Sequence, residues 1–212
     1  MSKTLYLECY SGISGDMTVA ALLDLGADRE VLKESLKSLP VGGFRTEITR
    51  VKKSGLDACD FSVILEQDNH DHDMEYLHGS EKSYTGHYEH SHEVNHEHHH
   101  GHTHSHEHPH EHRGMKEITE IIQKSEMTVR AKKMAMRVFD ILAQAESKAH
   151  GVPVEEVHFH EVGAVDSIVD IAAIAICMDN LDISNVIVPV LYEGTGFIRC
   201  QHGQIPVPVP AV

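Results

Sequence analysis

The stretch between residues 158 and 171 carries the side chains best suited to chemistry, and an almost wholly apolar run follows it. Its candidates are two imidazoles and three carboxylates: His158, His160, Glu161, Asp166 and Asp170. In an extended segment the two histidines point to one face, because side chains alternate along a strand. In a helix, two carboxylates four residues apart share a face. The spacing therefore predicts a divalent-metal or acid–base site between a strand end and a helix start.

A structural explanation of the same residues remains open. Asp166 could cap the helix, and the histidines could bond to the backbone. The position of Asp170 favours the functional explanation, because the helix around it is otherwise Ile, Val and Ala. A buried carboxylate needs a partner.

A second candidate site lies near the N-terminus, where the predicted strand Thr4–Cys9 leads into a loop and a helix that runs to Leu25. Free backbone N–H groups and the helix dipole make such a helix start an anion site. The residues predicted to bind a cofactor there are Ser11, Gly12, Ser14 and Gly15, with Asp16 as a catalytic candidate. The loop lacks Gly-Lys-Ser/Thr, so it is no P-loop. Helix capping by Ser14 or Asp16 accounts for it equally well.

Cys200 and His202 form a third pair near the C-terminal end. They share a face if the chain is extended there, which suits a soft metal ion. A buried thiol beside a turn histidine is the alternative.

Sixteen of the twenty histidines fall between His70 and His112. Residues 96–112 read HEHHHGHTHSHEHPHEH, with no apolar periodicity that could form a core. We predict that residues 70–114 are a disordered insertion that binds Ni, Cu or Zn ions through neutral imidazoles. The metal ligands expected there include His98, His100, His102 and His104. Storage or delivery fits such a segment better than catalysis, which needs fixed geometry.

The rest of the chain predicts an α/β or α+β fold, a layered sheet-and-helix domain formed by residues 1–69 and 115–212. Periodicity and end signals predict helices, a hairpin and a buried-type strand in these parts. The predicted elements are helices over 28–39, 115–124, 125–148 and 166–181, a hairpin of 44–51 with 57–65, and a buried strand over 186–191.

Composition narrows the class of protein. The 212 residues carry a formal net charge of −15, which argues against a nucleic-acid partner and suits a protein that handles cations. The four cysteines are scattered with no CxxC pair, and no apolar run approaches membrane-spanning length. These features predict a cytoplasmic protein with reduced thiols and no membrane partner.

Three segments together resemble a known family: YLECYSGISGDM near the start, HFHEVGAVDSIVDI in the middle and GFIRCQHGQIPVPVPA near the end. The chain is similar over its whole length to the N-terminal part of the LarC family, the nickel-insertion proteins of lactate racemase cofactor biosynthesis. The resemblance implies a CTP-dependent nickel chelatase, a lyase that uses Mg or Mn with CTP. Its substrate would be pyridinium-3,5-bisthiocarboxylic acid mononucleotide, and its product the nickel-pincer nucleotide.

The resemblance also implies partners. Family members continue beyond the Pro-rich segment into a second domain, so the C-terminal half of the same protein is an expected partner, and whether this part is active alone stays open. Lactate racemase and a homo-oligomer are further expectations. Carried over by residue, the resemblance points to eight side chains: Asp16, His158, His160, Glu161, Asp166, Asp170, Cys200 and His202. The sequence does not assign their roles, and we predict that the histidines and Glu161 bind the transition metal while Asp16 and Asp170 serve Mg²⁺ or proton transfer. We also expect the loop of residues 11–16 to lie close to the 158–171 stretch.

Two rival classes remain. One is a nonenzymatic nickel store or metallochaperone, with the ordered part as a scaffold for the His-rich insertion. The other is a phosphohydrolase that uses the Gly-bearing loop with the Asp and His residues.

Overall fold

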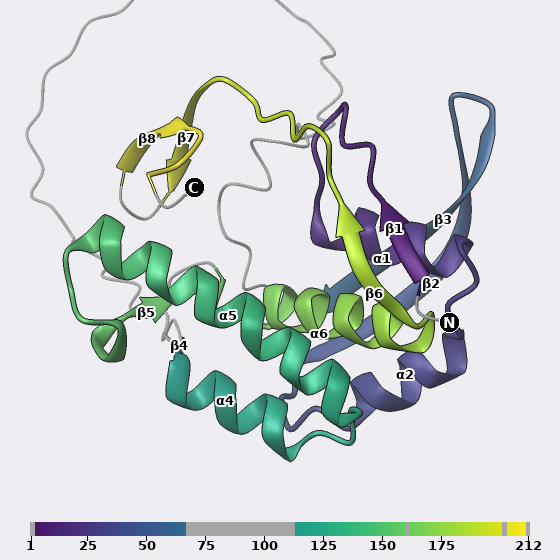
Figure 1. The fold of residues 1–212 in the computed structure, drawn as a ribbon, viewed down its shortest axis with the longest axis horizontal. Coiled ribbons are helices and arrows are strands. Elements are labelled where there is room, and N and C mark those ends of the chain that lie inside the picture. Colours follow the sequence, from purple (N-terminus) through teal and green to yellow (C-terminus); the bar gives the residue numbers. More distant parts are fainter. Residues whose placement is uncertain (1–2, 67–112, 160–161, 201–202, 211–212) are drawn as a thin grey trace, which may run out of the picture. The chain divides into compact units, whose positions relative to one another are not determined.

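The computed structural model describes residues 3–66, 113–159, 162–200 and 203–210 (Figure 1). The first part contains β1 (Lys3–Tyr6), α1 (Gly15–Asp24), α2 (Arg29–Lys37), β2 (Phe44–Lys53) and β3 (Leu56–Leu65). The second contains β4 (Arg113–Gly114), α4 (Met115–Lys124), α5 (Val129–His150), the short 3₁₀ turn η1 (Val154–Glu156) and β5 (His158–Phe159). The last contains α6 (Val165–Asn180), β6 (Ile183–Ile187), β7 (Gly196–Cys200) and β8 (Gly203–Val207).

The described strands form four two-stranded sheets. β1 pairs with β6 in parallel, although most of the chain lies between them. β2 and β3 form the predicted hairpin, and β4 with β5 and β7 with β8 form short antiparallel pairs. The mixed α/β class is confirmed, with helices rather than one large sheet at its centre.

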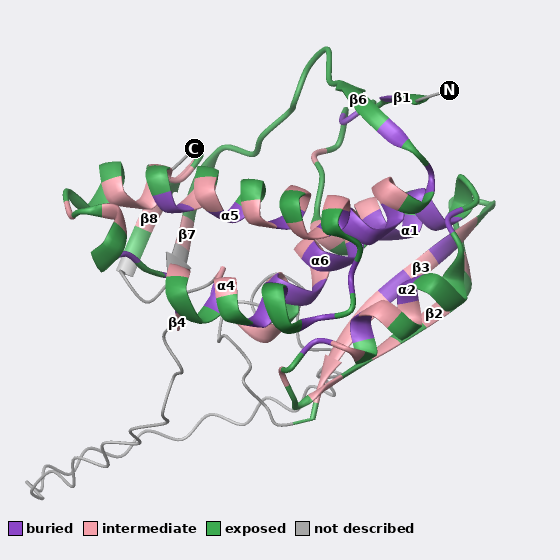
Figure 2. Ribbon diagram, turned by 60° about the horizontal axis from the view of Figure 1, so that its bottom comes forward, coloured by how far each residue is buried: buried purple, intermediate pink, exposed green. Residues whose placement is uncertain are grey.

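Helix α6 is the centre of the core. Its residues are apolar around most of its circumference, as expected for a helix with neighbours on several sides. Ile168, Val169 and Ala172 are fully buried, and α6 packs against α1, α2, α5 and the β2–β3 hairpin. Figure 2 shows this helix largely buried between α5 and α1. The only charged side chain in its middle is Asp170.

The helix ends follow the expected capping chemistry. Asp28 accepts hydrogen bonds from the N–H groups of Glu30 and Val31 at the start of α2, and Thr128 accepts one from Ala131 at the start of α5. Gly151 ends α5 in the left-handed conformation, with φ of 68°. The predicted helices over 28–39, 115–124 and 125–148 are therefore confirmed to within a few residues.

The prediction of a buried strand over 186–191 is wrong. The strand β6 begins at Ile183, which is buried, and ends at Ile187. The Val, Ile and Leu side chains between Val186 and Leu191 are each more than two-fifths exposed. The apolar composition predicted cover on both faces, as in most parallel sheets. In the described part of the chain, however, β6 has β1 as its only neighbouring strand.

Most of the predicted His-rich insertion lies outside the described residues. Its last two residues, Arg113 and Gly114, form β4 and pair with β5, so regular structure resumes two residues earlier than predicted. None of the helices that the structure describes is long and apolar enough to cross a membrane. Cys9, Cys59 and Cys177 are buried and form no disulfide.

Candidate functional site at two helix N-termini

The parallel pairing of β1 and β6 places the starts of α1 and α6 at the same end of the sheet, because each helix runs antiparallel to its adjacent strand. The pairing extends past the strands as a bridge between Cys9 and Leu191. Ligands of α/β proteins commonly bind beyond the carboxyl ends of parallel strands. The two sequence motifs thus meet at the location where a binding site is expected.

The two motifs contact each other where Gly15 lies against Asp170. A Cβ atom at position 15 would lie 2.7 Å from Asp170 Cβ and 2.8 Å from its Cγ, closer than such atoms ever pack. Only glycine therefore lets the start of α1 lie against the α6 carboxylate. The backbone N–H of Asp16 donates a hydrogen bond to that carboxylate.

Asp170 is partly buried, and its Oδ1 atom accepts no hydrogen bond from the described residues. Burial raises the pKa of Asp170 to about 7, and the negative charges of Asp16 and Asp166 add to the rise. The hydrogen bond from Asp16 opposes the rise only in part. A carboxyl group in this state exchanges its proton near neutral pH, which is what a general acid or base requires.

Asp16 is held by the residues around it. Its Oδ1 accepts hydrogen bonds from the Ser14 hydroxyl and, at 2.8 Å, from the N–H of Met17. Ser14 takes the N-cap position of α1 but makes no side-chain cap, since its hydroxyl faces Asp16 instead. Two N–H groups of the first turn thus bond to carboxylates. These surroundings favour a cation over a phosphate at this helix end.

Asp166 lies in the first turn of α6 and is exposed, and its Oδ1 accepts the Ser167 N–H at 2.9 Å. The N-cap of α6 is Ala164, so Asp166 does not occupy the cap position considered from the sequence. Asp16, Asp166 and Asp170 are close enough for their charges to interact. We call these three residues the carboxylate cluster.

His158 lies on β5, exposed, opposite Gly114 and close to Glu117 at the start of α4. Phe159 and Gly163, the described residues that follow it, each make specific contacts. Phe159 is buried against Phe139, with ring centroids 6.2 Å apart, and the Gly163 carbonyl accepts a hydrogen bond of 2.9 Å from Arg113. A Cβ at Gly163 would lie 2.7 Å from the Phe159 carbonyl oxygen, so this turn also requires glycine.

Several predicted ligands lie outside the described residues: His98, His100, His102, His104, His160, Glu161 and His202. Cys200 pairs with Gly203 in the β7–β8 hairpin, but its side chain is not described. Within the described ranges no group of three or more His, Cys, Asp or Glu side chains has the geometry of a metal site. The predicted roles of all these residues stay predictions.

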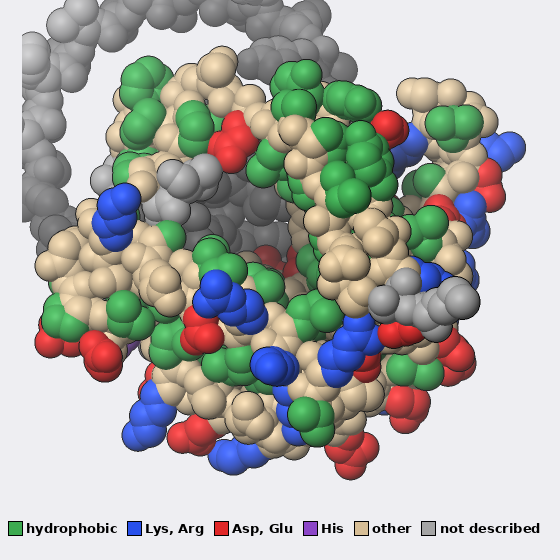
Figure 3. Space-filling model, viewed as in Figure 1, with side chains coloured by type: hydrophobic (Ala, Val, Ile, Leu, Met, Phe, Trp, Pro, Cys, Tyr) green, Lys and Arg blue, Asp and Glu red, His purple; other side chains and the backbone are tan. Residues whose placement is uncertain are grey.

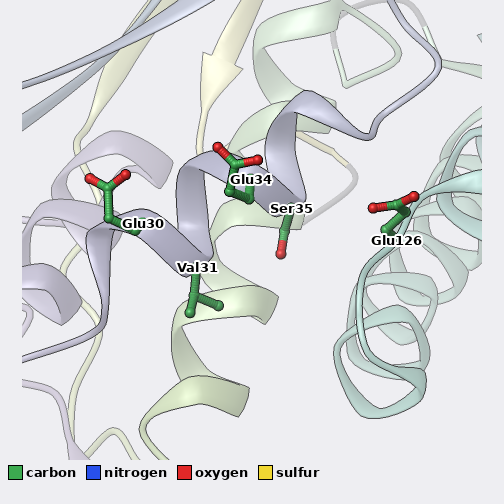
Figure 4. A pocket seen from close by; sticks show the side chains of 5 residues that line it. All are labelled: Glu30, Val31, Glu34, Ser35 and Glu126. Atoms are coloured by element: carbon green, nitrogen blue, oxygen red, sulfur yellow. The ribbon is translucent and has the colours of Figure 1, made fainter.

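A hollow on the described surface lies elsewhere. It has a volume of about 410 Å³ and is lined by three carboxylates of α2 and the α4–α5 connection, with Val31 and Ser35 (Figure 4). Two of its acids are already paired, Glu30 with Lys33 at 3.1 Å and Glu34 with Lys37 at 2.7 Å. A shallow surface of exposed ion pairs offers no reacting group.

Sequence reasoning assigned no role to Tyr10 and Tyr192, which stand beside the loop of the cluster. Their rings lie 6.0 Å apart, and a Cβ at Gly12 would lie 3.6 Å from the Tyr192 carbonyl oxygen. No local pattern could pair two residues so distant in sequence. The parallel register of β1 and β6, which brings them together, appears only in the fold.

Known proteins resemble the whole chain. The sequence profile of the family described as nickel insertion protein matches residues 5–212. Proteins named pyridinium-3,5-bisthiocarboxylic acid mononucleotide nickel insertion protein are similar to it: that of Alkaliphilus metalliredigens is 53% identical over 100% of the chain and 45% of its own length. Those of Clostridium acetobutylicum and Geobacillus kaustophilus are 46% and 42% identical over 99% of the chain, which is 48% and 43% of their own lengths.

No solved structure matches the chain. The chain spans less than half the length of the curated relatives it matches. The match nevertheless runs through the N-terminal loop, the 158–171 stretch and the Pro-rich end, the three segments that the sequence analysis singled out. The chain therefore belongs to the nickel insertion protein family.

Proposed function

We propose that this chain takes part in inserting nickel into pyridinium-3,5-bisthiocarboxylic acid mononucleotide, the reaction for which its relatives are named. The observation that carries the proposal is the Oδ1 atom of Asp170, which is buried beside Asp16 and Asp166 and accepts no hydrogen bond from the described residues. A buried polar atom of this kind costs free energy unless a ligand, ion or proton satisfies it. The carboxylate cluster is thus shaped for a positively charged or proton-donating group.

The chemistry needs a base. When Ni²⁺ forms a bond to a pyridinium carbon, the electron pair of the C–H bond goes to the new carbon–nickel bond and the hydrogen leaves as a proton. Asp170 is suited to accept that proton, because its pKa of about 7 lets it exchange protons at neutral pH. Asp16 and Asp166 would hold the positive charge of the metal or the pyridinium ring.

Nickel must also be held by few protein ligands so that exchange positions stay open. The 158–161 segment supplies the imidazoles and carboxylate that suit this role: His158, His160 and Glu161. Within and just after this segment, Phe159 and Gly163 are buried. Carboxylates that accept hydrogen bonds from the ring N–H groups would orient the imidazole rings.

The further components of the proposal come from the resemblance. They are CTP with Mg or Mn, a cytoplasmic setting, a lyase-type nickel chelatase activity and a product used by lactate racemase. The region that the relatives possess beyond this chain, the C-terminal half, is part of the proposal as a partner. The carboxylates at the start of α1 make that half a better place for CTP than the loop of Ser11 and Gly12.

The test is nickel insertion in a full-length form of the protein. We expect His160→Ala, Asp166→Ala and Asp170→Asn each to lower the rate of nickel incorporation at least 100-fold while the thermal unfolding profile stays cooperative. Asp140→Asn, which changes a carboxylate on α5 outside the cluster, is the matched control and should keep full activity. Near-normal activity of the His160 and Asp170 variants would show that the 158–171 motif is structural.

The second candidate function is a nickel store, which the sixteen histidines between His70 and His112 favour. Imidazoles lose metal as they are protonated below their usual pKa of about 6.5. Calorimetric titration of the chain with and without residues 70–112, at pH 7.5 and 5.5, separates the two functions. One equivalent of nickel retained by the deletion variant supports the insertion site, and loss of all binding supports the store.

A further inference from the structure

The surface around the β1–β6 pair exposes apolar side chains in the described structure. We call it the β1–β6 surface and define it by six exposed side chains: Tyr6, Tyr10, Ile187, Val190, Leu191 and Tyr192. Each exposes between 47% and 61% of its area. Figure 3 shows hydrophobic side chains gathered over the end of β6 and the segment that follows it.

The exposed area is large for a surface that faces only water. An aromatic side chain presents about 150–250 Å², so three tyrosines exposed by half account for roughly 300 Å². The three aliphatic residues, also exposed by about half, add less than the tyrosines do, so the total lies within the range of about 300–600 Å² that the largest apolar patch of a typical monomer spans, a patch that is often functional. It is a substantial part of the roughly 800 Å² that each partner buries in a stable interface.

The backbone of the pair is uncovered as well. Parallel strands normally lie inside a larger sheet with helices on both faces. Among the described strands β1 and β6 have only each other, so each has an outer edge that pairs with no other described strand. An added strand would pair with such an edge and cover the apolar side chains together.

The β1–β6 surface continues into the candidate functional site. Tyr10 and Tyr192 flank Gly12. Ile13, just before α1, and Met17, next to Asp16 in its first turn, are exposed by 45% and 54%. Whatever covers the β1–β6 surface therefore reaches the edge of the carboxylate cluster. It would exclude water from a site that reacts through charged groups.

We infer that the β1–β6 surface is the docking surface for the polypeptide that the full-length relatives carry beyond the region matched by this chain. The relatives are more than twice as long as this chain, so they carry a segment larger than the chain itself that needs an interface. This inference rests on the proposed function, in which the C-terminal half is a partner, and it names the surface that this half contacts. The functional site is then completed at the junction between the two halves.

Amide hydrogen exchange tests this docking. The 212-residue chain and the full-length Alkaliphilus metalliredigens relative are compared without nickel or CTP, so the result does not depend on the reaction. In the full-length protein, peptides that cover β1 and the segment from Ile183 to Tyr192 should exchange at least tenfold more slowly, after correction for sequence. The peptide across the turn between β2 and β3 should exchange equally in both and serves as the internal control.

Substitution in the full-length relative gives the second measurement. Lysine at the position aligned with Ile187 should remove the protection, whereas lysine at the position aligned with Val129, which is 85% exposed on α5, should leave it unchanged. Equal exchange in the two proteins overturns the inference. A second result would also overturn it. If the amides of the isolated chain become more protected as its concentration rises, and sedimentation shows a dimer, a second copy covers the surface.

Discussion

Asp170→Asn should stabilise the 212-residue chain, and more so at alkaline than at acidic pH. The substitution keeps the shape of the side chain and an oxygen for the Asp16 N–H, but it removes the charge. The folded-state pKa is about 7, raised by burial and then by the charges of Asp16 and Asp166, against 3.8 for the free group. A raised carboxyl pKa means that the folded protein binds the proton more tightly than the unfolded chain.

The sign and size of the effect follow from linkage. As pH rises from about 4 to about 7 the unfolded chain ionises freely while the folded protein resists, so the native state loses stability. With these two pKa values the loss between pH 5 and pH 8 amounts to about 2.5 kcal/mol, and partial exposure of the group reduces it to about 1–2.5 kcal/mol. The asparagine variant does not suffer this loss.

Urea denaturation of wild type and Asp170→Asn at pH 5 and pH 8 measures the effect. The quantity compared is the change in unfolding free energy caused by the substitution at each pH. The histidines of residues 70–112 titrate in both proteins, and their contribution cancels. Asp140→Asn controls for the loss of a carboxylate elsewhere and should show no pH-dependent difference. An equal stability change at both pH values, or a larger gain at pH 5, would refute the account of Asp170 as a carboxylate strained by burial and like charge.

Three further substitutions test the packing that positions the site. Gly15→Ala should destabilise the chain by about 1–3 kcal/mol in chemical denaturation, because its Cβ would overlap Asp170, whereas Gly42→Ala, with open space around it, should change little. Phe159→Ala should cost about 3–5 kcal/mol, since it removes a fully buried ring beneath the 158–161 segment; a cost below 1 kcal/mol would contradict the packing. Arg130→Met should lower the melting temperature more than Lys133→Met, because Arg130 pairs with Asp179 and Asp182 and bonds to the Ile183 carbonyl.

Helices were predictable because their signals are local. Asp28, Thr128 and Gly151 occupy the cap positions that their side chains or conformational freedom favour, and the apolar spacing between them matches the buried face. The hairpin followed in the same way from two strands joined by Ser54 and Gly55, both with positive φ. Local chemistry therefore determines most of the element boundaries in this chain.

The carboxylate cluster was predictable only in part. The spacing of Asp166 and Asp170 indicated one helix face, and the loop of residues 11–16 was expected close to it. Their contact depends on the parallel register of β1 and β6, which no local pattern encodes. The sequence also led us to expect a partner for a buried Asp170; the Asp16 N–H supplies one, while Oδ1 accepts no hydrogen bond from the described residues.

The exposure of residues 186–191, where a buried strand was predicted, has a physical consequence for Asp170. Val, Ile and Leu at these positions predict a strand covered on both faces, and the described chain leaves them exposed. If the β1–β6 surface is covered in the full-length protein, water leaves the edge of the cluster and the charges of Asp16 and Asp166 act on Asp170 through a lower dielectric. The pKa of Asp170 should then lie higher in the full-length protein than in this chain, until a bound cation lowers it again. Infrared titration of the Asp170 carboxyl, identified by its loss in Asp170→Asn, can measure that difference between the two proteins with and without nickel.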